Sequence, residues 1–342
     1  MIPVFAAVAA FGAAVVVTRV MEIFSRRQGL LDEPNERSSH AVPTPSSGGV
    51  GIIAGVACGL LVAAGWHDAE ASLIFAVAMA LGVVGLADDL GRVGILGKYL
   101  AQLAAAAIVT LALSPSVVVE VPGVSLQVDG LPATLLTLLW LTALINAFNF
   151  IDGIDGMLGW LAVTISIVGL GLVAPDAADV LLIIAGACLG FLVWNHPPAS
   201  IFMGDVGSQF LGLLVGTSLL RQPAEVVAVI PTIMVFAVPL FDTGFTLVRR
   251  LLAGKNVFTA HREHLYQRMA FLGRSHRLVT ALYASLTAVV GVVALTWPGL
   301  PPLGQLAIVA AIVVGLGVLA AWVARMERLA PRAADDGRGR SS

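Results

Sequence analysis

The sequence predicts an all-α polytopic membrane protein, and three observations support this fold class. Hydrophobic residues make up 58% of the 342 residues and charged residues only 12%, whereas a soluble domain carries roughly 25% charged residues. The mean hydropathy is +0.95. Apolar runs close to the roughly 20 residues that a spanning helix needs follow one another with short polar interruptions. Since these runs are continuous rather than alternating, a transmembrane β-barrel is disfavoured.

Apolar runs between polar breaks predict a bundle of about eleven spanning helices. The first run is not expected to be a cleaved signal peptide, because no basic region precedes it and Arg26 and Arg27 follow it. The predicted spans are residues 2–24, 49–66, 71–87, 98–114, 132–149, 157–174, 178–194, 207–221, 226–248, 277–297 and 303–325.

The basic residues predict how the bundle is oriented. Of the 19 lysines and arginines, only Arg221 falls in a connection that this order of spans assigns to the outside. Positive charge accumulates on the cytoplasmic side of membrane proteins, so the amino terminus is expected outside and the carboxyl terminus inside. Among the outer connections, 115–131 is β-branched and holds a Pro-Gly pair, which predicts a small hairpin.

A single integral membrane domain is expected over residues 1–330, followed by a disordered cytoplasmic tail at 331–342 that consists mainly of small and charged residues. The inside loop at about 250–276 is the candidate for an ordered element outside the membrane. Cys58 and Cys188 lie in apolar runs and are expected to be packing residues. A formal charge of -2 gives no sign of a nucleic-acid partner.

Five polar segments fall on the predicted inner face. The first joins the first two spans and carries Arg37, His40, three prolines and a Gly-Gly pair. It is either a flexible turn or a site for an anion, which the basic side chains and the backbone amides of residues 46–49 would bind.

The second segment places two adjacent carboxylates, Asp88 and Asp89, at the end of an apolar run, with Lys98 a short loop later. Adjacent carboxylates at a membrane boundary repel each other unless a cation or strong donors offset their charge. A loop cap is one interpretation. Mg²⁺ is the other, because this hard cation bridges carboxylates to substrate phosphates, and Lys98 would contact a phosphate.

The third segment repeats a polar side chain every three residues at the inner end of a span: Asn146, Asn149, Asp152 and Asp155. This spacing places the four side chains roughly on one helical or tightly turning face. Four amides and carboxylates in one line suit a nucleotide or a metal better than a simple helix end.

Three further features complete the pattern. Asp205 lies between glycines before an apolar span, where it would at least cap a helix.

His261, Arg262 and His264 form a basic cluster in the last inner loop. This cluster is either a solvated face or an anion site. Asp242 lies within a predicted span, which is a functional hypothesis by default; the alternative is a buried carboxylate paired with a neighbouring helix.

Together these segments resemble the polyprenyl-phosphate N-acetylhexosamine-1-phosphate transferases, the glycosyltransferase family 4 enzymes. The resemblance covers nearly the whole chain and rests on five motifs in the family's order: DEPNERSSH with PTPSSGGVGI, ADD at 87–89, NAFNFIDGIDGM, NHPPASIFMGDVGS and HREHLYQR. The resemblance implies an integral enzyme of the bacterial inner membrane with its active site facing the cytoplasm. Such enzymes transfer a sugar 1-phosphate from a UDP-N-acetylamino sugar to undecaprenyl phosphate, or another polyprenyl phosphate, and release UMP.

The resemblance also implies roles for individual residues. Asp205 is similar to the Mg²⁺ ligand of the family, with Mn²⁺ as the alternative ion, and Asp88 and Asp89 resemble the acidic pair that supports metal or catalysis. The implied substrate contacts are Asn146, Asn149, Asp152 and Asp155 for the nucleotide and metal-proximal segment, Lys98, His261, Arg262 and His264 for diphosphate or sugar, and Arg37 and His40 at the border of the cleft.

The last motif limits the choice of substrate. HREHLYQ replaces the unbroken histidine run of the translocase that uses a MurNAc-pentapeptide, so the chain looks like the branch that starts O-antigen or other surface glycans. The residues leave open which UDP-amino sugar is the donor, and a homodimer is compatible with the family but argued by no residue.

The inferred chemistry is attack of a lipid phosphate oxygen on the β-phosphorus of the donor, with a metal and basic side chains reducing repulsion between the two anions. The competing interpretation is a transporter for Mg²⁺ or a lipid-linked sugar. A transporter is expected to carry polar groups near the midplane, whereas here all but Asp242 lie at or beyond the inner ends of the predicted spans. A third interpretation, a scaffold without catalysis, predicts no dependence on metal.

Overall fold

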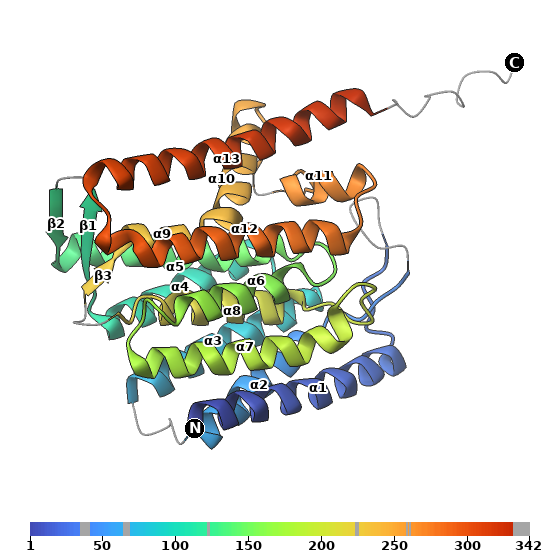
Figure 1. Ribbon diagram of the computed structural model, residues 1–342. Helices are drawn as coiled ribbons and strands as arrows, with labels where there is room; N and C mark the ends of the chain where they lie inside the picture. The colour runs from blue at the N-terminus through green and yellow to red at the C-terminus, as the bar shows by residue number, and fades with distance from the viewer. Residues whose placement is uncertain are drawn as a thin grey trace, which may run out of the picture.

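The computed structural model describes residues 1–34, 42–63, 69–121, 124–222, 226–257, 259 and 261–330. The chain is mostly helical, with one small sheet (Figure 1). The helices are α1 (Ile2–Gln28), α2 (Gly49–Val62), α3 (Ala69–Asp89), α4 (Ile95–Leu113), α5 (Gly130–Ile151), α6 (Met157–Gly169), α7 (Pro175–Asn195), α8 (Gly204–Ser218), α9 (Val229–Val235), α10 (Ala237–Leu252), α11 (Leu265–Phe271), α12 (His276–Thr296) and α13 (Pro302–Leu329).

The prediction of a polytopic all-α membrane protein is confirmed at the level of the helices. Within the described residues, seven helices are long and apolar enough to cross a membrane, or eight if α9 and α10, which meet at an angle of 80°, form one broken span. Helices α2 and α6 are apolar but shorter, and α8 has 15 residues. Each of the predicted ranges therefore falls on a helix or on the bent pair, while the predicted tail at 331–342 lies outside the described residues.

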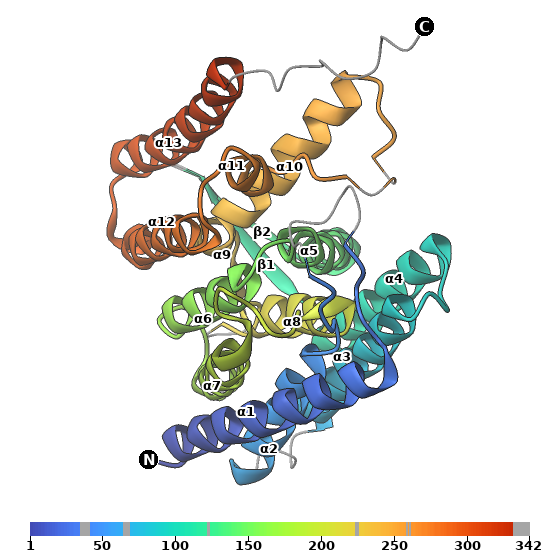
Figure 2. The ribbon, with the colours of Figure 1, turned by 90° about the vertical axis from the view of Figure 1, so that its right-hand side faces the viewer.

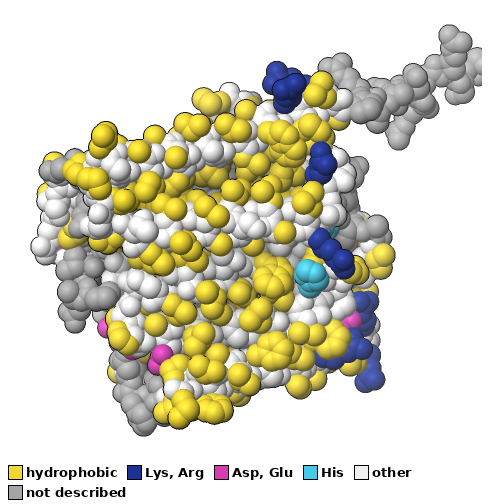
Figure 3. Space-filling view, in the orientation of Figure 1, with side chains coloured by type: hydrophobic (Ala, Val, Ile, Leu, Met, Phe, Trp, Pro, Cys, Tyr) yellow, Lys and Arg dark blue, Asp and Glu magenta, His cyan; other side chains and the backbone are white. Residues whose placement is uncertain are grey.

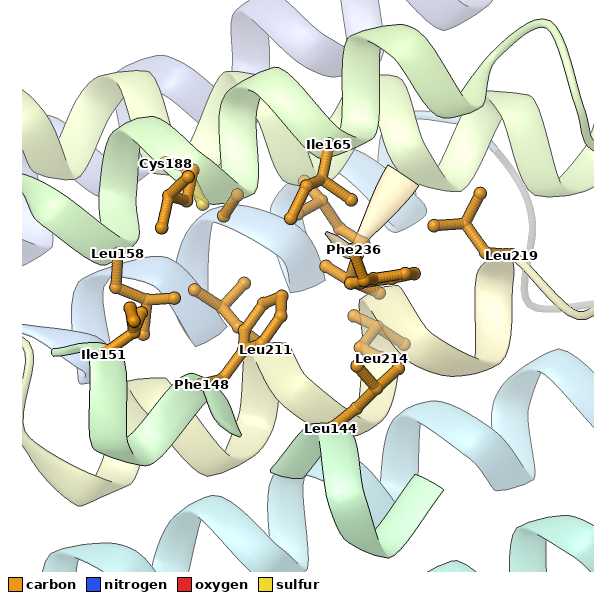
Figure 4. Packing of buried hydrophobic residues seen from close by; sticks show 14 of the residues in the cluster. Leu144, Phe148, Ile151, Leu158, Ile165, Cys188, Leu211, Leu214, Leu219 and Phe236 are labelled. Carbon is orange, nitrogen blue, oxygen red and sulfur yellow. The ribbon is translucent and has the colours of Figure 1, made fainter. Parts of the chain in front are cut away.

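Helix α8 lies near the centre of the bundle and contacts α2, α3, α4, α5, α6 and α7 (Figure 2). All of its residues from Val206 to Ser218 are buried. Figure 4 shows the apolar packing around it, in which Phe148 of α5, Leu211 and Leu214 of α8 and Phe236 converge. Cys188 is buried among these side chains, and both cysteines are unpaired, as expected for packing residues.

Close backbone packing fixes α2, α3 and α8 to one another. A Cβ at Gly49 would lie 2.3 Å from the backbone of Gly207, and a Cβ at Gly85 would lie 2.4 Å from the carbonyl oxygen of Asp205. Small residues let membrane helices approach this closely and are favoured at such interfaces. The backbone around Asp205 is therefore held by direct contact with α3.

The surface separates charge between the two ends of the bundle. On the face drawn in Figure 3, hydrophobic side chains cover most of the surface, and lysine and arginine side chains gather along the right-hand edge. At the opposite end, Arg221 pairs with Asp176 at 2.7 Å and with Glu70 at 3.5 Å. The one basic residue predicted for an outer connection therefore ties together the first turns of α3 and α7.

The same end carries a three-stranded sheet. Strands β1 (Ser116–Val121) and β2 (Val124–Val128) pair antiparallel, which confirms the predicted hairpin within 115–131. Strand β3 (Val226–Ala228) pairs parallel with β1 and gives the order β2-β1-β3. Strand β3 was not predicted from the sequence. It connects the hairpin to the start of α9.

Candidate active site

Three acidic side chains meet where α3 ends and α8 begins. Asp88 and Asp89 are the last two residues of α3, and Asp205 is the second residue of α8. The backbone amide of Asp205 donates a hydrogen bond of 3.1 Å to Oδ1 of Asp89. Because the first amides of a helix lack partners within it, Asp89 caps α8 from the neighbouring helix.

Lys98 lies between two of these carboxylates. It is in the first turn of α4, and its Nζ contacts Oδ2 of Asp205, lies 3.1 Å from Oδ2 of Asp88 and donates to Oδ1 of Asn149 at 3.3 Å. The ammonium thus offsets part of the repulsion between Asp88 and Asp205. The sequence predicted an offsetting cation or donor for the adjacent pair Asp88 and Asp89, and of these two acids Lys98 contacts Asp88.

Amide side chains complete the surroundings of Asp205. Nδ2 of Asn149, on α5, donates to Oδ1 of Asp205 at 2.6 Å and to Oγ of Ser208 at 3.1 Å. Gln209 donates to Oδ2 of Asp205 at 3.3 Å. The sequence analysis missed Ser208 and Gln209, although their spacing from Asp205 places them on the same face of α8.

Four helix ends therefore converge on one cluster: the end of α3, the start of α4, the end of α5 and the start of α8. These ends lie at the same end of the bundle, opposite the small sheet (Figure 1). Ionisable groups gathered at one end of a bundle favour chemistry at a membrane surface over an ion path through the midplane.

A cavity of about 460 Å³ opens next to this cluster. Its walls come from the start of α4, the end of α5 and the segment that precedes and begins α11. The lining residues that the sequence analysis predicted are Asp88, Lys98, Asn146, Asn149, Asp152, His261 and His264. The lining residues that it did not predict include Tyr99, Phe150, Val257, Thr259, Tyr266 and Gln267.

Asp152 lines the cavity in the structure, whereas Asp155 does not. Helix α5 ends at Ile151, and Asp152 follows as its C-cap and lines the cavity. Burial and the nearby charge of Asp205 raise the pKa of Asp152 to about 8. Asp155 instead accepts a hydrogen bond of 3.2 Å from the amide of Ala199 and lies 3.3 Å from Nδ1 of His276, so the structure does not bring it to the cavity.

The two histidines of the last inner loop stack against each other in the cavity wall, with ring centroids 4.9 Å apart. The ring of Phe150 stacks on His264 at 5.7 Å. Among the described residues, neither ring nitrogen of His261 has a hydrogen-bond partner. Burial, followed by the electrostatic influence of His264 and Arg250, lowers the pKa of His261 to about 4. His261 is therefore a neutral imidazole near pH 7.

Arg262 and the first inner segment lie elsewhere. The guanidinium of Arg262 sits 4.4 Å above the ring of Phe271 and does not line the cavity. Arg37 and His40 lie outside the described residues. The amides of Gly48 and Gly49 donate to the carbonyls of Phe202 and Met203 at 2.9 Å. These two of the four amides considered for an anion therefore hold the segment against the start of α8.

Three basic residues near the cavity form ion pairs with one acidic side chain. Arg249, Arg250 and Lys255 all contact Glu263, at 2.9, 2.5 and 3.0 Å. Arg250 also donates to the carbonyl of Asn256 at 2.6 Å. This network fixes the loop after α10 and brings its residues Val257 and Thr259 into the wall of the cavity.

The donor set of the cluster fits a hard cation such as Mg²⁺. Asp88, Asn149 and Asp152 line the cavity, and Asp205 lies behind Asn149, which donates to it. Their carboxylate and amide oxygens are the kind of ligand that Mg²⁺ prefers. In the described part of the chain, no three acidic, histidine or cysteine side chains are grouped closely enough to hold a metal alone. A cation here would take its other ligands from phosphate oxygens or water, as Mg²⁺ in phosphoryl-transfer sites does.

Comparisons with known proteins agree with this site. The model of glycosyl transferase family 4 matches residues 71–222. A probable undecaprenyl-phosphate N-acetylglucosaminyl 1-phosphate transferase of Bacillus subtilis is 31% identical over 275 residues, which cover 77% of this chain and 76% of that protein. The chain belongs to this family of polyprenyl-phosphate N-acetylglucosaminyl 1-phosphate transferases.

Other members of the family match to the same extent. A decaprenyl-phosphate N-acetylglucosaminephosphotransferase of Mycolicibacterium smegmatis is 33% identical, with 77% of this chain and 74% of the relative covered. The undecaprenyl-phosphate alpha-N-acetylglucosaminyl 1-phosphate transferase of Escherichia coli strain K12 is 30% identical, with 79% and 78% covered. The range matched by the family model contains the acidic cluster and Lys98, whereas the histidine loop lies beyond it.

Proposed function

We propose that this chain transfers an N-acetylamino sugar 1-phosphate from a UDP-sugar to undecaprenyl phosphate or another polyprenyl phosphate, with release of UMP. The observation that carries the proposal is the convergence of four helix ends on Asp88, Asp205 and Lys98 beside a cavity of about 460 Å³. The names of the relatives support the same reaction class.

The reaction joins two anions, so charge is the first obstacle. An oxygen of the lipid phosphate attacks the β-phosphorus of the donor, a new P–O bond forms, and the bond to the α-phosphate oxygen breaks to release UMP. Lys98 lies where its ammonium would hold donor phosphate oxygens. Because the lipid phosphate is already ionised near neutral pH, positioning and charge stabilisation contribute more than a general base.

Asp205 and Asp88 would hold Mg²⁺, with Mn²⁺ as the alternative ion. Bound there, the ion would neutralise charge on the diphosphate as the bond to UMP breaks. Asp89 supports the site by capping α8 through the amide of Asp205. Asn149 keeps the Asp205 carboxylate oriented through its hydrogen bond of 2.6 Å.

The proposal includes a place in the membrane. We propose about eleven spans in the bacterial inner membrane, with the amino terminus outside, the carboxyl terminus inside and the cavity open to the cytoplasm. Basic side chains along one edge of the bundle, and the sheet with the Glu70 and Asp176 ion pairs at the other, support this orientation. The product would begin a cell-wall or surface glycan such as an O-antigen.

The test is release of UMP by the purified protein from a panel of UDP-amino sugars. Undecaprenyl phosphate is present or absent, and Mg²⁺ is present or chelated. We expect UMP to be released only when both the lipid and the metal are present. The UDP-amino sugar that supports this release is the donor. Absence of release from every donor by folded protein would overturn the proposal and favour a transporter, for which the broken pair α9 and α10 is the structural argument.

A further inference from the structure

The inference concerns Asp242, a carboxylate of α10 that is 1% exposed and that the proposed reaction has not used. It lies within the bent pair, away from the acidic cluster. An ionisable group buried within a membrane protein is costly and marks either function or an internal partner. The contacts of Asp242 decide which of these applies.

Asp242 caps helix α11 from another helix. Oδ1 accepts a hydrogen bond of 2.8 Å from the amide of Leu265, and Oδ2 accepts one of 3.1 Å from the amide of Tyr266. These are the first two residues of α11, whose amides have no partner within the helix. From α12, the hydroxyl of Tyr283 donates to Oδ2 at 2.6 Å. Three elements are thus joined at one carboxylate.

The segment held in this way forms one wall of the cavity. His264 lines the cavity, and its Nδ1 lies 3.3 Å from Oδ1 of Asp242. The hydroxyl of Tyr266 donates to the carbonyl of Phe150 at 2.8 Å, close to the end of α5. A chain of hydrogen bonds therefore runs from Asp242 to the backbone just before Asp152.

The protonation of this group of residues follows from its donors. Two backbone amides and a tyrosine hydroxyl all donate to the carboxylate, and an ionised carboxylate only accepts. His264 is the N-cap of α11, and its side chain accepts a hydrogen bond from the backbone amide of Gln267. Its Nδ1 also lies 3.3 Å from the carboxylate of Asp242, so two contacts fix the orientation of the imidazole.

We infer that Asp242 is a positioning residue for the proposed transfer: it holds the imidazole of His264 in the cavity wall, where the ring contacts the bound donor. The inference rests on the proposed function, because one of its two tests measures the turnover of the proposed transfer. The competing explanation is that Asp242 only anchors α11.

A second anchor of α11 provides the matched control. Arg268 is buried, and its guanidinium binds Glu327 of α13 through bonds of 2.6 and 2.5 Å. If α11 only needs to be held in place, Glu327→Gln and Asp242→Asn should have similar effects on turnover. If Asp242 acts through His264, only Asp242→Asn should lower it strongly.

The experiment is a double-mutant cycle of Asp242→Asn with His264→Gln, beside Glu327→Gln, with thermal unfolding measured for every variant. Asp242→Asn is expected to lower kcat/KM about 10- to 100-fold, mostly through kcat, as expected when a contacting group is misplaced. In the His264→Gln background it should add no more than about twofold, because the two changes disturb one unit. An undiminished effect in that background would overturn the inference.

A spectroscopic readout makes the test independent of turnover. The protein is labelled with ¹⁵N-histidine, and the His264 signals are assigned by their loss in His264→Gln. These signals should shift in Asp242→Asn and stay in place in Glu327→Gln; unchanged signals in Asp242→Asn would overturn the inference. If the wild-type protein transfers no sugar phosphate, the proposed function fails, while these spectra still decide the role of Asp242. Should Asp242→Asn fail to fold, Tyr283→Phe, which removes one donor to the carboxylate, takes its place in both measurements.

Discussion

Lys98 and Asp205 are 107 residues apart in the chain, and in the fold the ammonium of one lies against the carboxylate of the other. Their contact joins the first turn of α4 to the first turn of α8. Asp88 shares the same ammonium at 3.1 Å. The cluster is therefore partly neutralised before any substrate phosphate or metal ion arrives.

Replacing Lys98 with Met should lower turnover about 100-fold or more, the usual effect of removing one group that stabilises charge in the transition state. Without the ammonium, Asp88 and Asp205 repel each other and donor phosphates lose a cation. The chain's other lysine, Lys255, is exposed, and Arg249 and Arg250 still hold Glu263 when it is replaced, so Lys255→Met is the control. Turnover and UMP binding are measured for both; equal activity in the two variants would contradict the role given to Lys98.

Asp205→Asn and Asp89→Asn should each abolish transfer while the protein stays folded. Asn at position 89 keeps an oxygen that accepts from the Asp205 amide, so the cap on α8 persists and the loss reports the missing charge. Asp129→Asn is the control, because Asp129 precedes α5 at the opposite end of the bundle and Asn keeps the Oδ1 that accepts from Ser116. Near-normal turnover in both Asp205→Asn and Asp89→Asn would contradict the proposed mechanism.

Gly85→Ala should destabilise the protein by about 1–3 kcal/mol, the usual cost of overpacking. The added Cβ would lie 2.4 Å from the carbonyl oxygen of Asp205, and a backbone atom cannot rotate away. Transfer should fall with stability, because the start of α8 must shift. Gly12→Ala, where a Cβ meets no atom within 4 Å, is the control. Thermal unfolding in detergent and UMP release test both variants, and unchanged values for Gly85→Ala would refute the prediction.

His261 should make the protein sensitive to acid. Its pKa falls from 6.5 to about 4 on folding because of burial and the electrostatic influence of His264 and Arg250. The unfolded chain then binds a proton more tightly, so the free energy of unfolding declines as the pH falls from about 6.5 to about 4. Glu263 raises the pKa of His261, but its effect is smaller than that of His264 or of Arg250.

The check is the midpoint of thermal unfolding at pH 7.5 and pH 5 for the wild type, His261→Gln and His196→Gln. His261→Gln should lose less stability on acidification than the wild type. His196 is exposed, so its replacement is expected to change little. An equal loss in the wild type and His261→Gln would show that His261 does not carry this dependence.

Single cysteines test the proposed orientation. Gln127→Cys lies on strand β2, at the end predicted to be outside, and Arg262→Cys lies in the loop predicted to be inside. In a background without Cys58 and Cys188, an impermeant maleimide should label the first in intact spheroplasts and the second only after lysis. The opposite pattern would invert the topology.

The sequence predicted the fold class and the acidic cluster because both depend on composition along the chain. Two adjacent carboxylates at a membrane boundary repel each other, and Asp88 and Asp89 stand out for that reason. Lys98 and Asp205 stand out as single charges beside apolar runs. Ser208 and Gln209 escaped because uncharged polar residues in a helix are common. The contact of Lys98 with Asp205 was beyond prediction, since it depends on how α4 packs beside α8.

Spacing was a weaker guide than composition. The three-residue period from Asn146 to Asp155 predicted one continuous face, but α5 ends at Ile151 and Gly156 adopts a left-handed φ of 73°. The helical period stops there, so Asp155 turns toward Ala199 instead. Strand β3 escaped for a similar reason: three residues carry little pattern, and they form a strand only because β1 lies beside them.

The close contact of α3 with α8 leaves the two sides of the cavity with unequal freedom to change during evolution. The acids stand on backbones that touch, so a larger side chain at Gly85 or Gly207 moves the chemistry itself. Val257 and Thr259 stand on a loop held by the Glu263 ion pairs and line the other side. Under the proposed function, substitutions in that loop would therefore change the shape of the cavity while leaving the acids in place.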